Sequence, residues 1–84
     1  MTDFKALITQ VVNNHQGIKA VELVVEVMQQ SAEMDLSMYE DALVDCIKDG
    51  EIVEVEYTIP AMDYRVKSLY LPKGSVVQAT GQGY

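Results

Sequence analysis

Asp41 and Asp45 are the residues of this sequence whose spacing comes closest to that of a chemical site. Side chains four positions apart share one face of a helix, so these two carboxylates could bind a cation, although acidic helix faces are more often only solvated. His15 is the one histidine, and no cysteine or carboxylate near it stands at metal-ligand spacing. The one cysteine, Cys46, excludes a CxxC site and a disulfide within the chain. No glycine-rich phosphate loop or serine-nucleophile motif occurs, so we expect a protein that is not an enzyme and uses no metal or cofactor.

The composition is that of a small globular protein. The chain has 84 residues, of which 49% are hydrophobic and 23% charged, and this length fits one domain too small for a deep catalytic cleft. Its net charge of -7 argues against nonspecific coating of DNA or of anionic membranes, which requires excess Lys and Arg. No segment approaches the roughly 18 apolar residues of a membrane span, and the first residues do not resemble a signal peptide. We expect a cytoplasmic protein that does not bind membranes.

Apolar residues at helical spacing predict three helices. The first can be capped by Thr2 or Asp3 and can end at Gly17. The second runs from about residue 20 to about residue 32, after a short extended connection at Ile18, although its valine-rich part could form a strand by propensity alone. The third begins with Ser37 and Glu40 as a capping box and ends at Gly50. Their predicted inner faces consist of Phe4, Leu7, Ile8, Val11 and Val12, of Leu23, Val24, Val27 and Met28, and of Tyr39, Ala42, Leu43, Cys46 and Ile47.

After Gly50 the hydrophobic period changes to two, which predicts a strand hairpin. Residues 53–59 alternate between apolar and polar, residues 60–63 form a loop, and residues 64–71 form a second strand that Pro72 ends. If Ile59 pairs with Tyr64, then Glu56 lies opposite Lys67 and could neutralise it. Residues 74–84 contain three glycines and little core material, so we expect a flexible tail.

Three helices followed by a hairpin resemble the winged helix-turn-helix superfamily. The stretch LVDCIKDGEIVEV at residues 43–55 is similar to a recognition helix that runs into the first wing strand, and YRVKSLYLP at residues 64–72 is similar to the returning strand. The resemblance implies an α+β domain over residues 1–73, with a C-terminal two-stranded wing. The whole chain also resembles small winged-helix proteins of tailed phages, which would place it in the host cytoplasm.

In that superfamily the third helix usually lies in the DNA major groove, but the corresponding face here is acidic. It carries four carboxylates and one amine, whereas base edges and phosphates call for Arg, Lys, Asn or Gln. Residues 33–56 have a local net charge of -8, and residues 57–84 have one of +2. The expected exposed face consists of Ser37, Met38, Glu40, Asp41, Val44, Asp45, Lys48 and Asp49.

Two interpretations follow from this charge pattern. In the first, the third helix binds a protein with a basic surface and regulates or inhibits a nucleic-acid-handling protein, with DNA mimicry as one route. Flexible methionines such as Met28, Met34, Met38 and Met62 suit adaptable apolar contacts, although the same acids could serve solubility and the methionines could fill core gaps. The predicted contact residues are Met38, Glu40, Asp41, Val44, Asp45 and Asp49.

In the second interpretation the protein is a small DNA-binding transcription regulator that acts as a homodimer. Its wing would touch the DNA backbone through Arg65, Lys67 and Lys73. Fold analogy alone favours this, and fold does not fix function.

Overall fold

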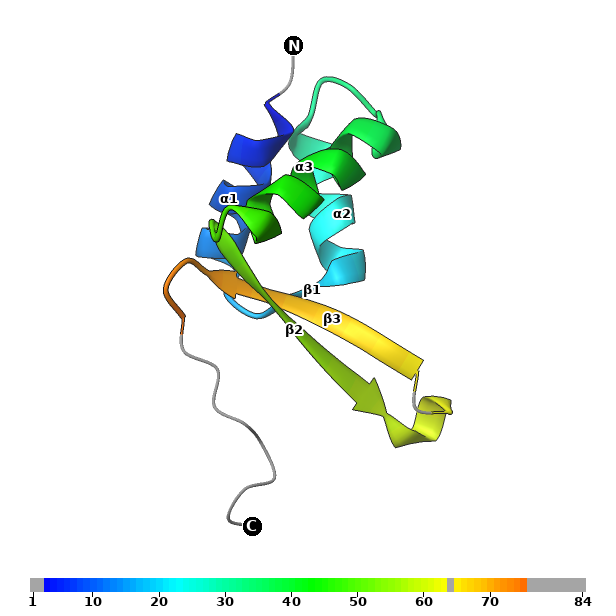
Figure 1. Cartoon of the computed structure of the whole chain (residues 1–84). Coiled ribbons are helices and arrows are strands. Elements are labelled where there is room, and N and C mark those ends of the chain that lie inside the picture. The colour runs from blue at the N-terminus through cyan, green and yellow to red at the C-terminus, as the bar shows by residue number, and fades with distance from the viewer. Residues whose placement is uncertain (1–2, 64, 76–84) are drawn as a thin grey trace.

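The chain folds as an α+β structure of three helices and a three-stranded antiparallel sheet (Figure 1). The computed structural model describes residues 3–63 and 65–75. Both strands of the expected hairpin and all three expected helices are present. In chain order the elements are α1 (Phe4–Asn14), β1 (Ile18–Lys19), α2 (Ala20–Gln30), α3 (Leu36–Lys48), β2 (Ile52–Ile59), the short 3-10 helix η1 (Pro60–Met62) and β3 (Arg65–Pro72).

The connection at Ile18 is a strand in its own right. β1 pairs with β3 through Ile18 opposite Tyr70, so the strand order is β1-β3-β2 and the sheet has one strand more than the hairpin predicted from the sequence. The backbone N–H of Gly17 also donates to the Tyr70 carbonyl at 2.9 Å. These contacts attach the α1–α2 connection to the sheet.

The helix caps agree with the sequence for α1 but not for α3. Asp3 caps α1 by accepting a hydrogen bond from the N–H of Ala6. The predicted capping box of Ser37 and Glu40 is wrong, because α3 begins two residues earlier, with Asp35 as its cap. A carboxylate of Asp35 accepts from the N–H of Met38 at 3.0 Å, and its negative charge suits the positive end of the helix dipole.

The core lies between the three helices and the inner side of the sheet. Each helix contributes residues from its predicted inner face, and Ile18, Ile52 and Tyr70 close the core from the sheet side. Cys46 is fully buried, as expected for a small apolar residue. The buried residues are Phe4, Ile8, Val11, Val12, Ile18, Leu23, Val27, Tyr39, Ala42, Cys46, Ile52 and Tyr70.

The predicted hairpin register is wrong by one residue. Ile59 pairs with Arg65, because β3 begins at Arg65, one residue after the predicted start, while η1 and the left-handed Asp63 (φ 58°) fill the predicted loop. Glu56 therefore lies opposite Ser68, and Lys67 lies opposite Tyr57. The expected Glu56–Lys67 pair does not form, since a shift of one residue moves a side chain to the other face of the strand.

The hairpin thus has two faces of different character, and its far end projects beyond the helices (Figure 1). The inner face carries Ile52 and Tyr70 against the helices and Glu54 and Glu56 farther out. The outer face carries the residues that alternate with these, all paired across the strands. It consists of Val53, Val55, Tyr57 and Ile59 of β2, Arg65, Lys67, Leu69 and Leu71 of β3, and Lys19 of β1 opposite Leu69.

The end of the predicted tail is outside the described part of the chain. Of residues 74–84, only Gly74 and Ser75 are described, and the Ser75 N–H donates to the Pro72 carbonyl at 3.1 Å. Among residues 3–63 and 65–75, no helix has the length and apolar character needed to cross a membrane.

Candidate partner-binding surface

The outward side of α3 brings the predicted contact residues together. Tyr39, Ala42 and Cys46 place one side of α3 in the core. The residues on the opposite side of the helix must therefore point outward. We call the six of these outward residues that were predicted to contact a partner the α3 surface. The exposed Lys48 lies beside them, one turn after Val44. The α3 surface consists of Met38, Glu40, Asp41, Val44, Asp45 and Asp49, all of them exposed.

Val44 lies at the centre of this surface and is 52% exposed. Glu40 and Asp41 precede it by four and three residues, which places all three side chains next to one another on the helix. Asp45 and Met38 extend the surface to one side. A partner would therefore meet an apolar centre bordered by three carboxylates and by Lys48, a net acidic pattern suited to a basic surface with an apolar contact of its own.

Asp49 differs from the other carboxylates because it already has a cationic partner. Its Oδ2 is 2.9 Å from the Nζ of Lys5 on α1, and this contact raises the pKa of Lys5. The pair is about half exposed, so it adds little to stability. It does neutralise Asp49 in place. Glu40, Asp41 and Asp45 are then the carboxylates of the surface that form no ion pair with a described residue.

The base of the α3 surface is firmly packed. The ring of Tyr39 is buried, and burial, followed by the charge of Glu40, raises the pKa of its hydroxyl to about 12. The thiol of Cys46 lies 3.7 Å from the Lys5 carbonyl and 3.9 Å from the hydroxyl of Thr9. Burial raises the pKa of this thiol, so it stays protonated and unreactive at neutral pH.

A second apolar area lies near the start of α3. Met34 is 82% exposed, and Leu36 is also exposed, so the α2–α3 connection offers side chains that the core does not use. Val24, Val25 and Met28 of α2 form an open apolar groove with Met34. Met34 and Met28 were noted in the sequence as adaptable contacts, but Leu36 and Val25 were not, because nothing in their spacing marks them as exposed.

The three cations predicted for DNA contact do not form one site. Arg65 and Lys67 lie on the outer face of the hairpin, whereas Lys73 follows Pro72 at the other end of β3. The Nζ of Lys73 is 3.6 Å from Glu51 Oε1 in an exposed ion pair. Only Arg65 and Lys67 therefore remain together as candidate phosphate contacts.

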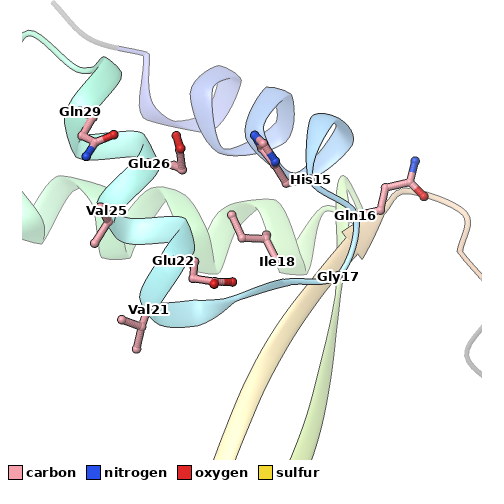
Figure 2. Close-up of a pocket in the computed structure, with 9 residues that line it drawn as sticks. All are labelled: His15, Gln16, Gly17, Ile18, Val21, Glu22, Val25, Glu26 and Gln29. Carbon is pink, nitrogen blue, oxygen red and sulfur yellow. The ribbon is translucent and has the colours of Figure 1, made fainter.

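A shallow depression along α2 and the α1–α2 connection contains the one histidine. Figure 2 shows His15 at the end of α1 and Glu22 and Glu26 on α2, with Val21 and Val25 along the outer side of α2. One of these carboxylates is engaged, since Glu22 accepts from the backbone N–H of Lys19 at 3.3 Å. Within the described residues, no three His, Cys, Asp or Glu side chains lie close enough to hold a metal ion.

The outer face of the hairpin was not predicted from the sequence as a binding surface. Val53, Val55 and Leu69 are only half-buried, although their apolar character fits a core. Alternation separates the apolar and the polar face of residues 53–59 correctly, but it does not say which of them packs against the helices.

We compared the sequence and the structure with known proteins. No protein-family model matches the sequence, and no curated protein or solved structure is significantly similar to it.

Proposed function

We propose that this protein is a winged-helix interaction module without catalytic activity, which binds a partner protein through the α3 surface. The observation that carries this proposal is the exposed Val44 bordered by Glu40 and Asp41 on a helix whose other side is fixed in the core. The order of three helices and a hairpin supports the winged-helix assignment. The partner carries a basic surface that also contains apolar side chains.

The biological role we propose is regulation or inhibition of a nucleic-acid-handling protein. A row of carboxylates on a helix can place negative charge in the site where such a protein binds nucleic-acid phosphates. Glu40, Asp41 and Asp45 would supply this charge, and Val44 and Met38 would add apolar contact.

The test is capture of partners by two forms of the tagged protein. Asp41→Lys/Asp45→Lys reverses two charges at exposed positions outside the buried side of α3. We expect this variant to lose the proteins that the wild-type chain retains, because like charges would face the basic partner. The control is Glu56→Lys, which reverses a charge on the inner face of the hairpin. Unchanged capture by Asp41→Lys/Asp45→Lys would contradict the proposal.

The alternative is DNA binding through the wing, and one observation favours it. The corrected register leaves Lys67 opposite Tyr57 rather than Glu56, so Arg65 and Lys67 form a small basic area. Fluorescence anisotropy with mixed-sequence duplex DNA across a salt series separates the two functions. A DNA-binding regulator would bind at low salt and lose affinity steeply as salt rises. The protein-binding function predicts no binding even at the lowest salt.

A further inference from the structure

The outer face of the hairpin combines an apolar floor with positive charge. Val53 lies opposite Leu71 and Val55 opposite Leu69, which gives two apolar cross-strand pairs side by side. Lys67 lies opposite Tyr57 and Arg65 opposite Ile59, toward the end of the hairpin that projects beyond the helices (Figure 1).

This face is the only concentration of positive charge among the described residues. Lys19 of β1 lies opposite Leu69 on the same face, so Lys19, Arg65 and Lys67 account for half of the chain's six Lys and Arg residues. Two of the other three cations form ion pairs with Asp49 and Glu51. No Asp or Glu occupies the outer positions of the three strands, although the chain has 13 acidic residues. An occupant of this face must therefore be acidic and partly apolar.

We propose that the outer face of the hairpin binds the α3 surface of a second copy of this chain. The α3 surface has the matching chemistry: Glu40, Asp41 and Asp45 provide three carboxylates, and Val44 and Met38 provide apolar contacts. This inference rests on the proposed function, because it names a partner for the same α3 surface.

The contact must form between two molecules. The three helices pack on the inner side of the sheet through Ile18, Ile52 and Tyr70, so α3 cannot reach the outer face of its own hairpin. The contact is heterologous, since two different surfaces meet, and it therefore leads to a ring or to an open chain of copies.

The test is sedimentation velocity over a concentration series at about 0.15 M salt, where a Debye length of about 8 Å screens the repulsion between whole molecules. We expect the mass of the wild-type chain to rise with concentration. Asp41→Lys/Asp45→Lys and Arg65→Glu/Lys67→Glu should each weaken self-association by about tenfold or more, because each places like charges across the contact.

Two further samples test the pairing itself. An equal mixture of the two double variants should associate again, since the Lys-bearing α3 of one meets the Glu-bearing hairpin of the other. The chain with all four substitutions keeps the wild-type net charge of -7, because the two reversals cancel, and it should associate by itself. Circular dichroism spectra test whether each variant is folded. Renewed association in the mixture would be independent evidence that both double variants are folded.

Three results would overturn the inference. The first is a wild-type chain that sediments as a monomer at every concentration. This result would leave the proposed function standing, since partner capture is a separate measurement. Association that persists after the α3 reversal would indicate another interface, such as two hairpin faces against each other. Failure of both the mixture and the fourfold variant to associate would show that the two surfaces do not meet.

Discussion

The hydroxyl of Tyr70 donates a hydrogen bond of 3.0 Å to Glu54 Oε2 across the hairpin. The two residues are direct cross-strand partners, so this bond is specific to the observed register. The ring of Tyr70 is 3% exposed and belongs to the core, while its hydroxyl reaches the edge of the core where Glu54 meets solvent. The contact thereby fixes which side of the hairpin faces the helices and which side stays open.

Loss of this hydrogen bond should destabilise the protein measurably. We expect Tyr70→Phe to lower the free energy of unfolding by about 1 kcal/mol, because the ring stays in place and only the hydroxyl contact disappears. Tyr57→Phe is the matched control on the outer face and should change stability by less than about 0.5 kcal/mol. Urea denaturation measures both. Equal stability of the Tyr70→Phe variant and the wild type would show that the contact does not hold the register.

Stability should fall at alkaline pH because of the buried tyrosines. Burial raises the pKa of Tyr39 to about 12, and burial together with the bond to Glu54 raises that of Tyr70. Both hydroxyls lose their protons more readily in the unfolded chain, near their ordinary pKa of about 10. Their contribution is fully present below pH 10 and is lost as pH rises through the folded-state pKa.

The measurement is thermal unfolding of the wild type and of Tyr39→Phe between neutral and strongly alkaline pH. We expect the midpoint of the wild type to drop above about pH 10, and that of Tyr39→Phe to drop less, since Phe cannot ionise. Parallel curves for the two proteins would contradict this assignment.

The sequence predicted the elements better than their pairing. Helical spacing identified the inner faces of all three helices, because a buried stripe leaves a strong period in the residues. The start of α3 was misplaced because Asp35 and Ser37 are both good caps, and only the folded backbone decides between them. The register was misplaced because the residues between the strands do not reveal that the second strand begins at Arg65, one residue later than predicted.

For the candidate site, too, the exposure of single residues could be predicted from the sequence, but contacts between distant elements could not. The outward side of α3 follows from its inward side, so the exposure of Asp41, Val44 and Asp45 could be predicted. The Lys5–Asp49 ion pair could not be predicted, because its partners are 44 residues apart and meet only when α1 packs against α3. The position of Lys19 beside Leu69 likewise depends on the pairing of β1 with β3.

Cys46 should be inert in the folded protein. Its side chain is fully buried and burial raises the pKa of the thiol, so both access and thiolate formation are reduced. We expect a thiol-specific reagent to label the native chain at least about a hundredfold more slowly than the chain in denaturant, because labelling requires opening of the core. Rapid labelling of the native protein would place Cys46 at the surface.

Asp49 should contribute less to partner binding than Asp45. Lys5 already neutralises Asp49 at 2.9 Å, whereas the charge of Asp45 acts on Lys5 only at longer range. We expect Asp45→Asn to weaken partner binding about threefold to tenfold, and Asp49→Asn to weaken it less than about twofold. Both changes remove one charge from the same helix end, so they are matched. A larger loss for Asp49→Asn would shift the contact toward the α1 side of α3.

The most direct test of the α3 surface uses a photo-crosslinking amino acid at one of two positions. Val44 lies at the centre of the α3 surface and is 52% exposed, whereas Val66 lies on the inner face of the hairpin and is 62% exposed. The two positions therefore match in residue type and exposure and differ in location. After irradiation in cell extract, we predict covalent adducts to partner protein from position 44 and few or none from position 66. Equal adducts from both positions, or adducts from position 66 alone, would contradict the claim that α3 is the binding surface.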